Sequence, residues 1–147
     1  MYEKIIKALD IRLNHIGKKT TNDENGNSIV VDSRLFTEEQ FIDAIEASIA
    51  TAGLFLAGPD NVRNNLDFYQ DIVTHGALLT ILSGHALLER GRECKIVDNG
   101  VVLDPPDISN ILMEQWYKEY DVYMEKLRML TTYVSTAAIT ANTSVTV

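Results

Sequence analysis

Residues 77–88 of the chain read ALLTILSGHALL, in which nearly every side chain is apolar or small. A helix with this sequence has no polar side, so it must be surrounded, either by its own domain or by neighbouring copies of the chain. The helical pattern around it runs from about Asn65 to Arg90 and closes at Gly91. We therefore expect this helix to lie at the centre of the fold.

Two helices are predicted before the central one. The first starts at Tyr2, carries apolar residues at three- and four-residue spacing as far as Ile16, and ends at Gly17. The second begins at Thr37, which forms a capping box with Gln40. Its apolar face consists of Phe41, Ile42, Ile45, Ile49, Ala52 and Leu56. Gly58-Pro59 is the expected end, with glycine as the C′ residue and proline blocking continuation.

The last long helix is predicted to follow Asp107 or Ser109, either of which can act as its N-cap. Its apolar face is rich in aromatic residues and comprises Ile108, Ile111, Leu112, Trp116, Tyr120, Tyr123, Leu127 and Leu130. These aromatic rings can lie partly in the core and partly at its solvent-exposed edge, or they can form an interface with a partner protein.

Short extended segments are predicted between the helices and at the end of the chain. Asn99-Gly100 between β-branched runs indicates a hairpin near residues 95–103. Residues 20–28 are polar and are interpreted as an exposed loop, and residues 29–31 as a short strand or an extended segment. Residues 134–147 contain no charged side chain and are predicted to form an extended tail.

The expected fold is therefore mainly α. It is a bundle of about four helices in a single domain, residues 1–133, with one small β-hairpin and an extended C-terminal tail, residues 134–147. A chain of 147 residues with 46% hydrophobic residues can form one domain with a real core.

Charge and composition exclude several classes of function. The chain has 13 basic and 21 acidic residues, a net charge of −8, so it is a poor candidate for gripping a phosphate backbone. A surface that DNA passes without binding remains compatible with this charge. The N-terminus lacks a signal-peptide pattern, and no run of eighteen apolar residues predicts a membrane span. The single cysteine, Cys94, suits a reducing compartment such as the cytosol.

Two patterns invite a metal-site hypothesis, and neither supports one well. An EF-hand count places Thr21, Asp23, Asn25, Gly26, Asn27 and Asp32 at positions one, three, five, six, seven and twelve. Threonine at the first position and aspartate at the last depart from the motif, so a plain polar loop is the preferred interpretation. On the central helix, His75 and His85 lie roughly 15 Å apart along the axis, too far to share one metal.

These histidines are instead expected to form two separate contacts with the acidic residues four positions away, Asp71 with His75 and His85 with Glu89. The sequence has no nucleophile elbow, P-loop, dinucleotide glycine pattern or paired Cys-x-x-Cys. Ser83 and His85 are two residues apart and point away from each other on a helix. We expect no enzymatic activity, no metal and no cofactor.

Two sets of residues are candidates for protein contacts. Small residues on one face of the central helix permit close approach of another backbone: Gly76, Thr80, Ser83 and Gly84. Apolar residues of the uncharged tail are candidates for docking onto a partner, for example by adding a strand to its sheet: Val134, Ile139, Val145 and Val147.

Residues 65–130 resemble a stretch found in virion structural proteins of large tailed bacteriophages. The residues that carry the resemblance are Gly76-Ala77-Leu78-Leu79, Ala86 to Glu93, Asp98-Asn99-Gly100, Pro105-Pro106-Asp107-Ile108-Ser109 and the helix containing Trp116. Among virion proteins, the size and helix content are most similar to head–tail adaptors, also called connector or neck ring proteins.

The resemblance implies a homo-oligomeric ring in the neck of the virion, synthesised in the host cytoplasm, with portal and tail proteins as partners. It also implies that DNA passes through the ring, and that an extended tail docks onto the next ring. Other classes fit the same residues. They are another virion role, such as head completion, tail termination or capsid decoration, and a small cytosolic helical enzyme or ligand-binding module.

Overall fold

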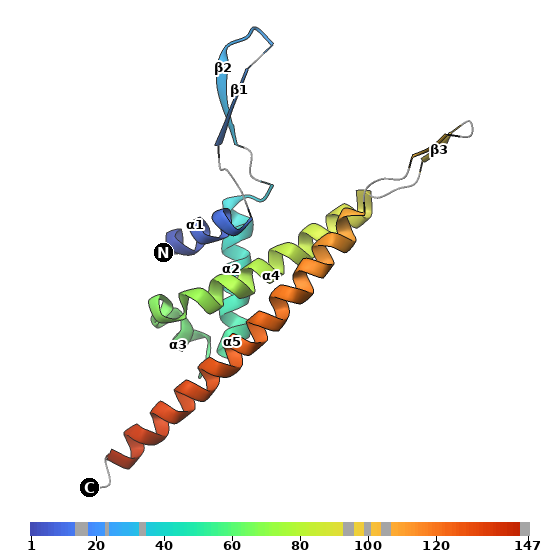
Figure 1. Cartoon of the computed structure of the whole chain (residues 1–147). Helices are drawn as coiled ribbons and strands as arrows, with labels where there is room; N and C mark the ends of the chain where they lie inside the picture. The colour runs from blue at the N-terminus through green and yellow to red at the C-terminus, as the bar shows by residue number, and fades with distance from the viewer. Residues whose placement is uncertain are drawn as a thin grey trace.

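The computed structural model describes residues 1–13, 18–22, 24–32, 35–92, 96–98, 101–103 and 107–144. This part of the chain is mainly α, with five helices packed as a bundle (Figure 1). The helices are α1 (Glu3–Arg12), α2 (Glu38–Gly53), α3 (Pro59–Asn64), α4 (Leu66–Arg92) and α5 (Ile108–Ser144). The short α3 is additional to the four predicted helices.

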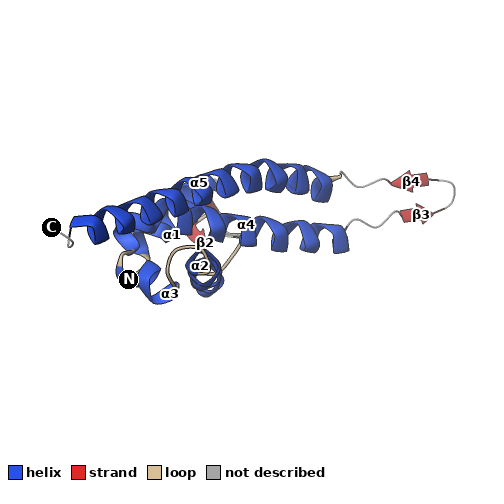
Figure 2. Cartoon of the chain, turned by 90° about the horizontal axis from the view of Figure 1, so that it is seen from below, coloured by secondary structure: helices blue, strands red, loops and turns tan. Residues whose placement is uncertain are grey.

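Helix α4 occupies the centre, as its sequence predicts. It packs along α5 on one side and across α2 on the other, and α1 covers its flank. Figure 2 shows α4 and α5 running side by side as a long helical hairpin. The most buried side chains join these helices: Phe41, Ile45 and Ile49 of α2, Ile72, Val73 and Ala77 of α4, and Leu9 of α1.

Not all of the apolar segment is covered within the chain. Leu87 and Leu88, near the C-terminal end of α4, are 71% and 52% exposed. By length and composition, residues 66–91 would also pass as a membrane span, but just over half of that window is buried inside the bundle. Burial against α2 and α5 accounts for its apolar character.

The start of α2 confirms the capping box. The hydroxyl of Thr37 accepts from the backbone N–H of Gln40 at 3.2 Å, and the Gln40 side chain accepts from the N–H of Thr37 at 2.9 Å. These two bonds satisfy donors that the first turn of a helix leaves unpaired.

The predicted end of α2 at Gly58-Pro59 is wrong. Helix α2 ends at Gly53, and the chain turns so tightly that a Cβ on Gly53 would lie 2.4 Å from the nitrogen of Pro59. The N–H of Gly58 donates to the carbonyl of Gly53 at 2.8 Å, and Ala57 adopts a positive φ of 63°. Gly58 is the N-cap of α3, and Pro59 occupies its first turn.

Two antiparallel hairpins project from the bundle (Figure 1). The first pairs β1 (Lys18–Asn22) with β2 (Ser28–Asp32), and the second pairs β3 (Ile96–Asp98) with β4 (Val101–Leu103). The second lies where Asn-Gly predicts a hairpin, although residues 99 and 100 themselves are outside the described part. The expected loop at residues 20–28 is wrong for its first residues, because Lys18–Asn22 pairs with the β-branched run at 29–31.

The C-terminal tail is helical rather than extended over residues 134–144. Helix α5 continues without interruption to Ser144. Extending an existing helix adds one hydrogen bond for each residue fixed, so no new nucleus is needed. Ala137, Ala138 and Ala141 favour this extension. Ile16, Gly17 and residues 145–147 lie outside the described residues.

Candidate functional site

The residues that were considered as a calcium loop belong to a hairpin. Thr21 lies in β1 and Asp32 in β2. Asn25, Gly26 and Asn27 lie in the turn between the strands, where Gly26 adopts a positive φ of 81°. Asp23 lies outside the described residues. Within the described part of the chain, no three His, Cys, Asp or Glu side chains gather as metal ligands would.

A polar pair of a buried histidine and a partly exposed glutamate joins the middle of α4 to α5. His75 is 2% exposed, and its Nε2 lies 2.7 Å from Oε2 of Glu119. The predicted contact between His75 and Asp71 is replaced by this bond to the neighbouring helix, whereas the predicted contact between His85 and Glu89 is found at 3.5 Å. His75 Nδ1 is buried and has no hydrogen-bond partner among the described residues.

The environment of His75 favours its neutral form. Burial lowers the pKa of His75, and the positive charges of Lys126 and then Arg12 lower it further, while Glu119 acts in the opposite direction. A neutral imidazole that donates from Nε2 leaves only a lone pair at Nδ1, which is cheaper to bury unpaired than an N–H group. The pair therefore fixes α5 against α4 without a buried net positive charge.

Asp71 connects three helices at the edge of this pair. It accepts from Arg12 of α1 at 3.1 Å and from Lys126 of α5 at 2.5 Å. The hydrogen bond from Lys126 is the main cause of a lowered pKa at Asp71. A cavity of about 450 Å³ lies beside these groups, lined by Arg12, Leu13, His75, Leu78, Leu82, Gln115, Glu119 and Lys126.

The four small residues of α4 do not share one role. Gly76 is in close contact inside the chain, since a Cβ placed there would lie 2.2 Å from Oγ of Ser48 on α2. A Cβ on Gly84 would meet nothing within 4 Å, and Thr80 is exposed. The hydroxyls of Thr80 and Ser83 bond to carbonyls of their own helix. Close packing within the fold thus involves Gly76 alone of the four.

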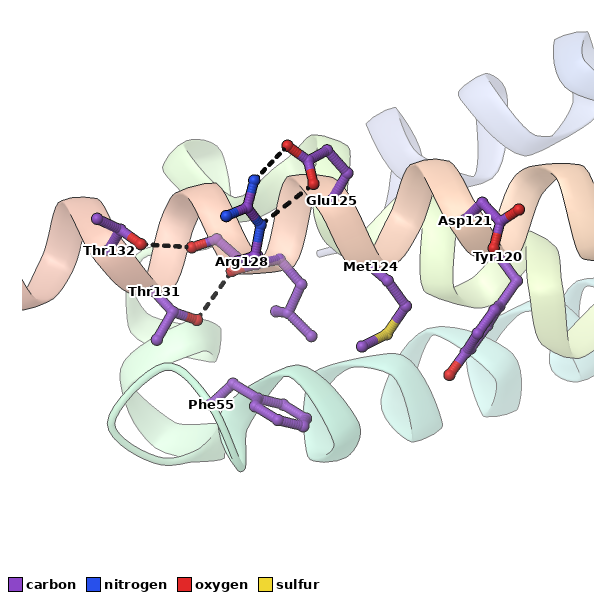
Figure 3. A pocket seen from close by; sticks show the side chains of 9 residues that line it. Phe55, Tyr120, Asp121, Met124, Glu125, Arg128, Thr131 and Thr132 are labelled. Atoms are coloured by element: carbon purple, nitrogen blue, oxygen red, sulfur yellow. Dashed lines mark hydrogen bonds and ion pairs between the residues drawn. The ribbon is translucent and has the colours of Figure 1, made fainter.

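An apolar groove lies between α5 and the turn after α2. We call it the Phe55 groove. It has a volume of about 610 Å³ and is lined by Phe55, Tyr120, Asp121, Met124, Glu125, Leu127, Arg128, Thr131 and Thr132. Figure 3 shows Phe55 on one side, facing Met124 and Arg128 of α5 on the other. Phe55 is 50% exposed.

Charge within the Phe55 groove is largely balanced. Arg128 donates to both carboxylate oxygens of Glu125, at 2.8 and 3.2 Å, and this contact lowers the pKa of Glu125. Three more exposed apolar side chains, Phe68 of α4 with Met129 and Tyr133 of α5, line a separate recess. Apolar surface of this extent, rimmed by polar groups, is typical of a protein-contact surface.

Beyond the Phe55 groove, α5 ends in an uncharged segment, residues 134–144. Figure 1 shows it extending past the rest of the bundle. The side chains described from Ser135 onward are exposed. Hydroxyl groups along this part of α5 donate to the carbonyl four residues earlier, as in Thr132 to Arg128, Ser135 to Thr131, Thr136 to Thr132 and Thr140 to Thr136. Because these hydroxyls already donate a hydrogen bond within the helix, removing them from water costs less free energy than it does for a hydroxyl without such a bond.

The residues predicted to dock onto a partner are distributed along this end of α5. Val134 is half-buried and packs against the core. Ile139 lies within the helix, and Val145 and Val147 lie outside the described residues. The sequence analysis missed Phe55, although the apolar pair Leu54-Phe55, close before Gly58, is unusual for a solvent-exposed turn.

Comparison of the chain with protein-family models, with curated proteins and with solved structures finds no match.

Proposed function

We propose that the protein is a non-enzymatic structural protein of a tailed-phage virion, a head–tail adaptor that forms a homo-oligomeric ring between portal and tail. The observation that carries the proposal is the combination of the exposed Phe55 groove with an uncharged helical end on the same helix. A chain with these surfaces has apolar area that remains to be covered by a protein partner.

The charge of the chain supports the passage of DNA through such a ring. With a net charge of −8, the protein repels a phosphate backbone on average, so DNA can move past it without being held. Portal and tail proteins are the partners proposed for the two faces of the ring. The projecting hairpins β1–β2 and β3–β4 offer exposed backbone edges for such contacts.

The proposal is tested with the full chain and the portal protein of the same virion. Light scattering measures the mass of each protein and of their mixture, and electron microscopy of stained particles shows their shape. We expect a ring, formed by the chain alone or on the portal, and no retention of duplex DNA. A chain that stays monomeric with and without the portal would contradict the proposal.

A second candidate function is binding of a small ligand in the cavity beside His75 and Glu119, which is large enough for a small organic molecule. Trp116 offers a convenient signal, because it is half-buried near this region and its indole donates to the carbonyl of Leu79 at 3.0 Å. Ligand-dependent quenching of Trp116 fluorescence by a monomeric chain would favour this function over the ring.

A further inference from the structure

We propose that residues 134–144 of one copy lie in the Phe55 groove of a second copy. This inference deepens the proposed function, on which it rests, by naming the contact that joins neighbouring copies. The contact is of the helix-in-groove type, in which one helix places its apolar side in a recess of its partner.

Charge favours a contact between these two surfaces. Copies with a net charge of −8 repel each other, so a contact between them is best made by surfaces that carry little net charge. Residues 131–147 contain no Asp, Glu, Lys or Arg. In the groove, Arg128 is paired with Glu125, which leaves the lining with the single net negative charge of Asp121. The uncharged end of α5 and this groove can therefore meet with little electrostatic cost.

The described side chains of the helical end also favour the contact. Its hydroxyls at Ser135, Thr136 and Thr140 already donate to carbonyls of the same helix. The other exposed side chains described there are those of Ala137, Ala138 and Ala141. Removing such a surface from water breaks few hydrogen bonds, which suits a contact with Phe55, Met124 and Tyr120.

The groove of a copy is out of reach of the end of its own α5. Helix α5 forms one wall of the groove and continues unbroken to Ser144. At 1.5 Å per residue, Ala141 lies about 21 Å further along the axis than Leu127. The helical end cannot return to its own groove without breaking α5. Each copy thus offers one helical end and one groove, and such head-to-tail contacts close into rings or continue as filaments.

The size of the contact fits an assembly with more than one interface per copy. The helical end is about 16 Å long and 10–12 Å across. Its contact with a groove buries on the order of 1,000 Å² in total, near the lower limit for specific interfaces. A single contact is therefore weak, whereas a closed ring gives every copy two of them.

The test uses full-length variants with a charge placed on either side of the contact. Phe55→Asp alters the groove, and Ala138→Glu alters the exposed helical end. Leu54→Asp is the matched control, since Leu54 is 81% exposed, adjacent to Phe55 and not part of the groove lining. Circular dichroism and thermal unfolding verify that each variant is folded, and analytical ultracentrifugation measures self-association.

We expect Phe55→Asp and Ala138→Glu each to weaken self-association about tenfold or more, and Leu54→Asp to leave it unchanged. Mixing the two defective variants is the decisive step, because the intact helical end of one fits the intact groove of the other. The mixture should form one-to-one pairs that neither variant forms alone.

Three results would overturn the inference: a wild-type chain that never self-associates, normal assembly of Phe55→Asp, or failure of the mixture to form pairs. If Phe55→Asp assembles normally and the chain forms rings, the contact proposed here is wrong, but the proposed function still holds. A chain that forms no ring even with the portal would instead remove the proposed function.

Discussion

A Cβ atom on Gly76 would lie 2.2 Å from Oγ of Ser48, so α4 and α2 approach each other closely at this pair. Ser48 is 3% exposed, and its hydroxyl donates to the carbonyl of Val73 at 2.8 Å, so a rotation of this side chain would break a buried hydrogen bond. On the other side, the same Cβ would lie 3.2 Å from Cε2 of Tyr123 on α5. Three helices therefore meet at one glycine.

Gly76→Ala is predicted to destabilise the protein by about 1–3 kcal/mol, the usual range for overpacking in a core. Gly84→Ala is the matched control on the same helix. It should stabilise the protein by about 0.5–1 kcal/mol, because its Cβ meets nothing within 4 Å and alanine is the better helix former. Chemical denaturation measures both changes.

The mechanism is checked by adding Ser48→Ala to Gly76→Ala. Removing Oγ relieves the shorter clash, while the contact with Cβ of Ser48 at 3.2 Å remains. The double variant should therefore be more stable than additivity predicts. Strict additivity of the two changes would show that the loss at Gly76 has another cause.

Tyr123→Phe is predicted to leave stability unchanged or to raise it by about 1 kcal/mol. Tyr123 is 5% exposed, and its hydroxyl is buried without a partner among the described residues. Phenylalanine keeps the ring and removes only the unsatisfied hydroxyl. The substitution therefore removes the cost of burying that hydroxyl and leaves the packing of the ring unchanged. A marked loss of stability, measured by thermal unfolding, would mean that this hydroxyl is hydrogen-bonded in solution.

The stability of the protein should fall as the pH drops below about 6.5, the ordinary pKa of histidine. In the folded state the pKa of His75 is lowered, chiefly by burial, so the unfolded chain binds the proton more readily. The contribution of neutral His75 is therefore fully present above that pH and is lost below it. The charged groups around it are Glu119, Lys126, Arg12 and Asp71.

His75→Gln tests this prediction, since glutamine can still donate to Glu119 but does not titrate. The variant should lose less stability between about pH 7 and pH 5 than the wild type. The same slope in both proteins would count against His75 as the titrating group.

Ala57→Gly is predicted to stabilise the protein by about 0.5 kcal/mol. Ala57 adopts a φ of 63°, which costs a residue with a Cβ about 1–2 kcal/mol and costs glycine almost nothing. The greater freedom of glycine in the unfolded chain offsets part of this gain. Comparison of unfolding midpoints for the variant and the wild type measures the net effect, and a lower midpoint for the variant would contradict the strain at Ala57.

Two local signals in the sequence predicted the local structure correctly. The capping box at Thr37 and Gln40 involves four consecutive residues, and the hairpin near residues 95–103 follows from Asn-Gly between two short apolar runs. The central position of α4 was also predictable, because an apolar surface on every side of a helix leaves few other arrangements.

Features that depend on distant residues were not predictable in the same way. His75 is paired with Glu119, which is 44 positions away in the sequence, rather than with Asp71 on its own helix. The turn over Gly53 gives Ala57 a positive φ of 63° as well as Gly58 one of 100°, and the residue types alone would favour a positive φ only at the glycine. The groove at Phe55 likewise exists only because α5 passes the end of α2.

The continuity of α5 has a mechanical consequence. Its 37 residues form a rod about 55 Å long, from the base of the β3–β4 hairpin to the free C-terminal end. A twist or shift imposed at one end of a rod reaches the other end without a hinge to absorb it. Partners at the two ends of this molecule would therefore sense each other through rigid-body motion of a single helix.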